Sequence, residues 1–253
     1  MQSTGGTVEG HRVGGLAGFS QSGFKRRNGW PLSQKVATQA LQHRLFIGRS
    51  DGLPPVGQPD LLAHHNPRDL SNCLNDGALV KLITNRLLLR PFEPSDIDER
   101  YLGWLQDPEV TRFSNQRFRS HTLESCFAYQ RSFKDSQNNF LIIEHRADQV
   151  PVGTMTIYRA EHHGTADIGL MLGNRSYWRQ GLGLEAWCTV LNALIQDAGL
   201  RKVTGGTARP NKGMVKIMEQ SGMQLEAVRH QQELIEGQPV DLLYYARFAE
   251  GLA

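Results

Sequence analysis

The spacing of apolar residues from position 82 onward predicts a succession of short strands and helices. The apolar run 87–90 predicts a strand, and Ser95 or Asp96 is expected to cap a helix whose apolar residues continue to Leu105. A second helix is expected to begin near Thr122. The domain therefore opens with one strand followed by two helices.

The rest of the pattern alternates strands with helices. Three apolar segments joined by short turns come next, which is typical of an antiparallel meander. The predicted elements are strands at 140–143, 151–158 and 165–172, a helix at 184–195, a strand at 202–207, a helix at 211–220 and two final strands, the last at 240–248. Helices separate some strands and not others, so the fold class is α/β, in detail a mixed α+β fold whose sheet is covered by helices.

Residues 1–77 differ from the rest in composition. They contain 12 Gly and 5 Pro, whereas residues 78–253 contain 14 and 6, so the density of these residues halves near Gly77. Their apolar residues follow no sustained period, which predicts a disordered or weakly structured extension before a domain at 80–253. Three other interpretations stay open: a transit peptide, a basic localisation cluster, or untranslated sequence before an initiator at Val80.

Charge and cysteine content exclude several classes of protein. The 28 Lys and Arg exceed the 25 Asp and Glu by only three, an excess that lies in residues 1–77, so no nucleic-acid partner is expected. Cys73, Cys126 and Cys188 are far apart and fit neither a disulfide framework nor a zinc site, which indicates a reducing compartment. The sequence contains no apolar run long enough for a membrane span or a secretory signal. We therefore expect a cytoplasmic protein without a membrane partner.

The most informative segment is the glycine-containing loop at 177–186, which leads directly into an amphipathic helix. Free amides and the positive end of a helix favour a phosphate or pyrophosphate there, although a glycine turn that only starts a helix has the same pattern. Gly181 and Gly183 lie too far from the preceding strand for a dinucleotide fingerprint, and no acidic residue follows at the required distance. A P-loop is absent. A phosphate-bearing cofactor of another kind is the remaining functional interpretation.

Three motifs in order resemble the GNAT superfamily of acyl-CoA N-acyltransferases, and most closely its ribosomal-protein (RimJ/RimL-like) type. They are Ile168–Leu172, Tyr177–Ala186 and Asn211–Met223, preceded by Arg86–Phe92 and Trp104–Val110. The resemblance covers about residues 82–249 and implies a GNAT fold, with a mostly antiparallel mixed sheet splayed at the cofactor site. It also implies acetyl-CoA as the cosubstrate.

The same resemblance implies the residues that hold acetyl-CoA. The pantetheine arm would bond to the backbone of Met171 and Leu172, and Asn211 would face that arm. The pyrophosphate would lie on the amides of a continuous loop: Arg179, Gln180, Gly181, Leu182, Gly183 and Leu184. Asn115, Arg117 and Arg119 fall where this type lines the groove for the acceptor amine, and a charged loop that is only solvated is the equally open alternative.

The catalytic groups are less clearly marked. The family commonly has a serine or tyrosine acid at positions that are Met214 and Met218 in this chain. Asp167, near the start of the strand that carries Met171, is the candidate base, and a solvated strand-edge carboxylate is the equally open alternative. His162 and His163 have no carboxylate partner at ligand spacing, so no metal is predicted.

These inferences predict an acyl-CoA-dependent N-acyltransferase that moves an acetyl group to a primary amine by direct attack in a ternary complex. The acceptor would be a small molecule or a protein amine, with a protein N-terminus or an amino sugar favoured, and the protein a monomer or homodimer. A non-catalytic module that retains the fold as an acyl-CoA-binding or interaction surface is the alternative, which the two methionines keep open.

Overall fold

The computed structural model describes residues 74–75, 78–79 and 81–251, so the predicted extension lies almost entirely outside the described residues. The strands are β1 (Leu74–Asn75), β2 (Ala78–Leu79), β3 (Leu82–Ile83), β4 (Leu87–Pro91), β5 (Asn139–His145), β6 (Val150–Ala160), β7 (Thr165–Met171), β8 (Lys202–Ala208), β9 (Gln224–Ile235) and β10 (Gln238–Phe248). The helices are α2 (Glu99–Gln106), α3 (Pro108–Thr111), α4 (Leu123–Arg131), α5 (Leu182–Asn192) and α6 (Lys212–Gln220). Short 3₁₀ turns at Pro94–Asp96, Asn115–Phe118, Glu161–His163 and Arg175–Tyr177, and a π turn at Ala193–Asp197, complete the list. No described helix is both long and apolar enough to span a bilayer.

Eight strands form one sheet in the order β3-β4-β5-β6-β7-β8-β10-β9, and β1 pairs with β2 separately. Every pairing in the large sheet is antiparallel except β7 with β8. The predicted meander, the mixed sheet and the fold class are thus confirmed. The helix α5 makes the crossover between the parallel strands β7 and β8, and short turns join the antiparallel pairs β5–β6, β6–β7 and β9–β10.

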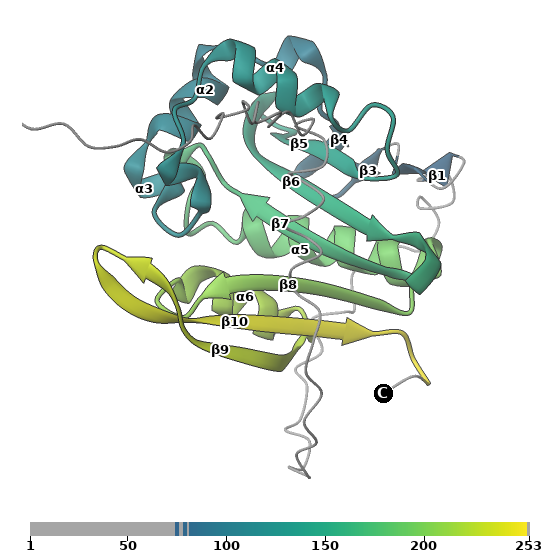
Figure 1. The fold of residues 1–253 in the computed structure, drawn as a ribbon. Helices are drawn as coiled ribbons and strands as arrows, with labels where there is room; N and C mark the ends of the chain where they lie inside the picture. Colours follow the sequence, from purple (N-terminus) through teal and green to yellow (C-terminus); the bar gives the residue numbers. More distant parts are fainter. Residues whose placement is uncertain (1–73, 76–77, 80, 252–253) are drawn as a thin grey trace, which may run out of the picture. The chain divides into compact units, whose positions relative to one another are not determined.

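The parallel pair β7–β8 is short. It has three residue pairs, the last of which joins Asp167 to Thr204. Beyond that pair β7 continues to Met171 and β8 to Ala208, and Figure 1 shows the two strands diverging along this stretch. The sheet is therefore splayed where the sequence resemblance placed the cofactor.

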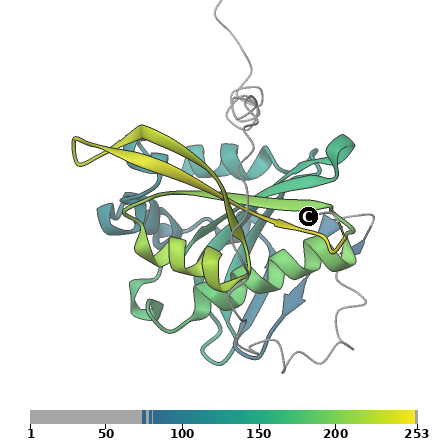
Figure 2. The ribbon, with the colours of Figure 1, turned by 90° about the horizontal axis from the view of Figure 1, so that it is seen from below.

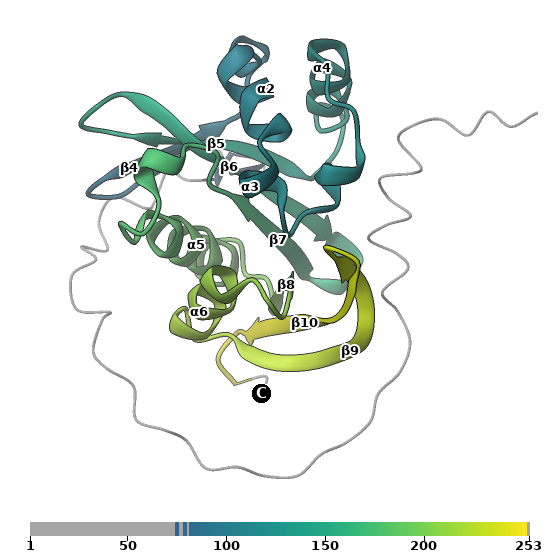
Figure 3. The ribbon, with the colours of Figure 1, turned by 90° about the vertical axis from the view of Figure 1, so that its left-hand side faces the viewer.

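Helices cover both faces of the sheet. On one face, which we call the α5 side, α5 and α6 lie side by side and bury Trp187, Met218 and the inward side chains of the central strands (Figure 2). On the other face, the α2 side, α2 and α4 enclose an aromatic cluster that includes Phe92, Tyr101 and Phe140 (Figure 3). Because strand side chains alternate, β5 contributes Leu141 and Ile143 to the first cluster and Phe140 and Ile142 to the second.

The cap of the first helix was predicted incorrectly. Asp98, and not Ser95 or Asp96, caps α2 by accepting a hydrogen bond from the amide of Tyr101 at 2.9 Å. Asp96 is buried and is bound to Arg90 through a pair of 2.8 Å contacts. The two-pronged ion pair with the half-buried guanidinium of Arg90 stabilises the Asp96 carboxylate more than capping α2 would, so the helix begins later, after Asp98.

Candidate active site

The loop before α5 is built to receive an anion. Arg179 and Gly181 have positive φ angles of 62° and 78°, and Gly181 is the N-cap of α5 without a side-chain cap. The first amides of a helix have no acceptor within the helix, so those of Leu182, Gly183 and Leu184 are available for a ligand. Left-handed residues alternating along such a loop turn successive amides toward one concave surface, and the helix dipole adds positive potential.

Arg86 fixes the shape of this loop. Its Nη1 donates to the carbonyl oxygen of Gln180 at 2.8 Å, and its Nε donates to Oε2 of Glu185 at 2.7 Å. The hydroxyl of Thr84 donates to the other carboxylate oxygen at 2.5 Å. Burial raises the pKa of Glu185, but the hydrogen bonds from Thr84 and Arg86 outweigh it and leave the pKa below its usual range. Glu185 is therefore ionised and holds the first turn of α5 to the strand that contains Arg86.

The end of β7 offers a backbone edge next to that loop. From Ile168 to Met171, β7 bonds to β6 on one side, while no described strand pairs with its other side. The carbonyl of Leu172 accepts a hydrogen bond from Nε1 of Trp178 at 2.8 Å, which ties the strand end to the loop. Unpaired amides and carbonyls at a strand edge bind an extended ligand well. Met171 and Leu172 thus lie where a pantetheine arm could pair with the backbone.

Asn211 is the N-cap of α6. Its Oδ1 accepts from the amide of Met214 at 3.3 Å, and its Nδ2 donates to Thr207 at 3.1 Å. Both polar groups of this side chain are therefore engaged in the fold. The structure gives Asn211 a role in orienting the start of α6, in addition to any contact with a cofactor.

Asp167 lies at the vertex of the splay, on the α2 side. One of its oxygens accepts a 2.8 Å hydrogen bond from the hydroxyl of Thr204. The side chain is exposed to water, and desolvation by the neighbouring protein atoms nevertheless raises its pKa to about 6, against the opposing effect of the Thr204 bond. A carboxylate with this pKa is mostly ionised at pH 7 and is still a stronger base than an ordinary aspartate.

Two tyrosines stand on either side of Asp167. Tyr158 is its register partner on β6, and Tyr244 on β10 lies over Gly206 of β8. Burial, reinforced by the charge of Asp167, raises the pKa of Tyr158 and brings that of Tyr244 to about 12. The hydroxyl of Tyr158 also contacts that of Tyr129 at 2.8 Å. Both phenols are neutral near pH 7, so Asp167 is the group in this cluster that can accept a proton.

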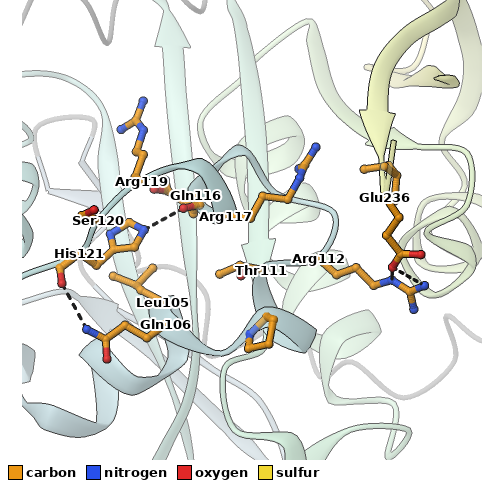
Figure 4. A pocket seen from close by; sticks show the side chains of 12 residues that line it. Leu105, Gln106, Thr111, Arg112, Gln116, Arg117, Arg119, Ser120, His121 and Glu236 are labelled. Atoms are coloured by element: carbon orange, nitrogen blue, oxygen red, sulfur yellow. Dashed lines mark hydrogen bonds and ion pairs between the residues drawn. The ribbon is translucent and has the colours of Figure 1, made fainter. Parts of the chain in front are cut away.

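A cavity of about 560 Å³ lies on the α2 side, between the 105–121 segment and the β9–β10 turn (Figure 4). Arg117 lines it and donates to the carbonyls of Ser114 and Leu234, at 2.7 and 3.0 Å, which joins these two segments. Asn115 is exposed and is not among the lining residues. Of the three residues that the resemblance places at the acceptor groove, Arg117 and Arg119 line this cavity and Asn115 does not.

Comparisons with known proteins agree with this geometry. The model of the acetyltransferase (GNAT) domain matches residues 86–224, more than half of the chain. This chain belongs to the GNAT acetyltransferase family. It is 24% identical over 169 residues to the uncharacterized N-acetyltransferase YoaA of Bacillus subtilis. The aligned region covers 65% of this chain and 94% of YoaA. Membership of the family makes it an N-acetyltransferase and confirms the resemblance found in the sequence.

Two solved GNAT structures show the same fold. One is RimL, a ribosomal L7/L12 α-N-protein acetyltransferase in complex with coenzyme A, with a TM-score of 0.60 and 15% identity over 67% of this chain and 98% of that one. The other is a spermidine N-acetyltransferase from Vibrio cholerae in complex with CoA and spermine, with a TM-score of 0.59 and 14% identity over 67% and 99%. Both neighbours bind CoA, and their acceptors differ in kind.

The two positions where GNAT enzymes commonly have an acid are occupied by packing residues here. Met218 is 1% exposed within the α5-side core, and Met214 packs against the same cluster. Of the cysteines, Cys126 is buried and Cys188 half-buried, and desolvation raises the pKa of both thiols, so neither is a ready nucleophile. His162 and His163 are exposed, and the described residues contain no group of three or more side chains placed to bind a metal.

Proposed function

We propose that this N-acetyltransferase takes its acetyl group from acetyl-CoA and transfers it to a primary amine of low pKa, either a protein N-terminus or an amino sugar. The pyrophosphate would lie on the amides of residues 179–184 and the pantetheine arm along the open edge of β7. The observation that carries the proposal is that these two features are adjacent, joined through the bond between Trp178 and Leu172. A donor spanning both would present its thioester near the vertex of the splay.

The chemistry requires a neutral amine at the thioester carbonyl. A new C–N bond forms as the amine attacks, the C–S bond breaks, and the sulfur leaves with its electron pair. Asp167 would take the ammonium proton, directly or through water, since its pKa of about 6 leaves it ionised at pH 7. A thiol of pKa about 8.5 leaves as a thiolate without an acid, so the methionines at 214 and 218 are compatible with turnover.

The preference for a low-pKa amine follows from the same balance. An α-amine of pKa about 8 is roughly one-tenth neutral at pH 7, whereas a lysine of pKa about 10.4 is neutral to about four parts in ten thousand. That difference is about 3 kcal/mol of additional deprotonation. Asp167, a single carboxylate hydrogen-bonded to Thr204, provides limited driving force for deprotonating a lysine ammonium. Protein α-amines and sugar amines, whose pKa values are lower, are therefore the better acceptors.

The test measures donor binding and turnover separately. Arg179→Glu reverses a charge on the exposed part of the loop and should weaken acetyl-CoA binding at least tenfold by calorimetry. Lys134→Glu makes the same charge change at an exposed site beyond α4 and should leave affinity unchanged. Thiol release from acetyl-CoA is then followed with α-amine peptides, amino sugars and Nα-acetyl-lysine, which presents only the ε-amine. Unaltered affinity in Arg179→Glu would refute the donor site, and thiol release with Nα-acetyl-lysine alone would refute the acceptor class.

A further inference from the structure

The walls of the α2-side cavity carry an excess of positive charge. Arg112, Arg117 and Arg119 line it, and Glu236 is the one carboxylate among its lining residues. Arg112 and Glu236 form an ion pair at 2.8 Å and neutralise each other. Two guanidinium groups are thus left without a counter-charge from the cavity wall.

The guanidinium groups of Arg117 and Arg119 differ in the contacts that they already make with the protein. Arg117 donates to two backbone carbonyls and lies over the ring of Phe118 at 4.2 Å, so its planar group is largely committed to the fold. Arg119 is exposed; its backbone amide donates to the carbonyl oxygen of Gln116, but its side chain forms no ion pair or hydrogen bond with any residue that the structure describes. Figure 4 shows it at the opposite end of the cavity from the pair of Arg112 and Glu236. Arg119 is therefore the group that can engage a ligand.

The position of Arg119 relative to Asp167 follows from Tyr158. Tyr158 is the register partner of Asp167 on β6, and its hydroxyl lies 2.8 Å from that of Tyr129 on α4, the helix that follows the segment with Arg119. In keeping with this placement, the charge of Asp167 raises the pKa of Tyr158 and the charge of Arg119 lowers it. Leu105 lines the cavity and belongs to the same apolar cluster against which Met171 packs. The α2 side thus presents a carboxylate at the vertex and a free guanidinium at the cavity.

We propose, resting on the proposed function, that the preferred acceptor is a primary amine with an anionic oxygen group a few bonds away, held by Arg119 while Asp167 faces the amine. A carboxylate or a phosphate supplies the same chemistry, since both accept hydrogen bonds from a guanidinium in a fork. An acidic N-terminal peptide and a phosphorylated amino sugar are two sources of it. A polyamine is disfavoured because its second ammonium would approach Arg119.

The experiment compares acceptors that differ only in charge. Thiol release is measured for the peptide pair Ser-Asp-Ala-Ala and Ser-Asn-Ala-Ala, for glucosamine and its 6-phosphate, and for spermidine. The wild-type protein should show a KM about tenfold or more lower for the anionic member of at least one pair, and the pair that shows it identifies the source. The preference should weaken between about 50 and 500 mM salt, because the charges are close to solvent.

Variants then assign the preference to one residue. Arg119→Gln should bring the KM ratio of that pair close to one, and Arg119→Glu should favour the neutral member. Lys134→Gln, an exposed change outside the cavity, should leave the ratio as in the wild type. Equal use of both members by the wild type, or a ratio unaffected by Arg119→Gln, would overturn the inference while the proposed function stands. A preference for spermidine over the peptides and the sugars would refute the proposed acceptor class, and this inference with it. So would a protein that binds acetyl-CoA but acetylates none of these amines.

Discussion

Replacing Asp167 by asparagine tests the proposed base directly. The change removes the ionisable group and keeps an oxygen that can accept the hydrogen bond from Thr204, so the splay should be preserved. Because the pKa of Asp167 is about 6, the wild-type kcat/KM for an α-amine peptide should fall as the pH drops below 6. At pH 7 the variant should be about 100-fold slower, the lower range of what a positioned base contributes.

The variant should recover as the acceptor loses its own proton. An α-amine of pKa about 8 changes from about one-tenth neutral at pH 7 to about nine-tenths neutral at pH 9, which returns roughly a tenfold gain in rate. Thiol release measured from pH 5 to 9.5 gives both profiles. A variant equal to the wild type at pH 7, or one that keeps an acidic limb near pH 6, would refute the assignment of Asp167.

The same substitution has a consequence for stability with a defined sign. A carboxyl whose pKa is raised from 3.8 to about 6 by folding destabilises the fold above pH 6, and this cost disappears below about pH 4. The shift corresponds to a ceiling of about 3 kcal/mol, and because water reaches the side chain we expect about 1 kcal/mol. Asp167→Asn should therefore melt at a higher temperature at pH 7.5 and equally at pH 4, whereas Asp135→Asn, an exposed control, should show no such difference. A stabilisation that is independent of pH would contradict the desolvation of Asp167.

Three further changes test the supports of the site. Arg86→Ala should weaken acetyl-CoA binding about tenfold by calorimetry, and Arg86→Lys less, since the lysine keeps the charge and loses the fork that joins the loop to α5. Gly173→Ala should lower the free energy of unfolding by about 1–3 kcal/mol, because a Cβ there would lie 2.0 Å from the ring of Trp104. Gly103→Ala is the control: its Cβ would have no atom within 4 Å, and because alanine favours a helix over glycine the free energy of unfolding should rise by about 0.5–1 kcal/mol. A chain that begins at Val80 should keep its melting temperature and its affinity for acetyl-CoA, since the described apolar clusters contain only residues from 82 onward; a loss of several degrees would show that the preceding residues contribute to the fold.

Most strands and helices could be predicted from the local spacing of apolar residues. The strands at 140–143, 151–158 and 165–172 were predictable as short apolar or loosely alternating segments separated by turns, and the loop at 177–186 because glycines precede a long apolar helix. The start of α2 was not, since Ser95, Asp96 and Asp98 are all acceptable caps, and only the half-buried partner Arg90 decides that Asp96 is used elsewhere.

The missed parts of the site depend on contacts between distant segments. Arg86 and Glu185 are 99 positions apart, so no spacing rule connects them, even though each lies within a motif quoted for the family resemblance. The cavity forms where the 105–121 segment meets the β9–β10 turn, which contributes Ile235 and Glu236. The sequence could identify Arg117 and Arg119 as charged loop residues, but only the pairing of Arg112 with Glu236 shows which guanidinium is left for a ligand.

The donor and acceptor sites depend on different parts of the topology. A parallel connection requires a crossover, and α5 is the crossover between β7 and β8, so its N-terminus must lie near the carboxyl end of β7. The anion loop, the open strand edge and the vertex with Asp167 are therefore consequences of one parallel pairing within an otherwise antiparallel sheet. The cavity proposed for the acceptor instead lies between the β9–β10 turn and the 105–121 segment, neither of which takes part in that pairing. Substitutions at Arg119 should consequently alter the choice of amine while acetyl-CoA affinity stays constant, and a parallel loss of both would show that the two sites are coupled.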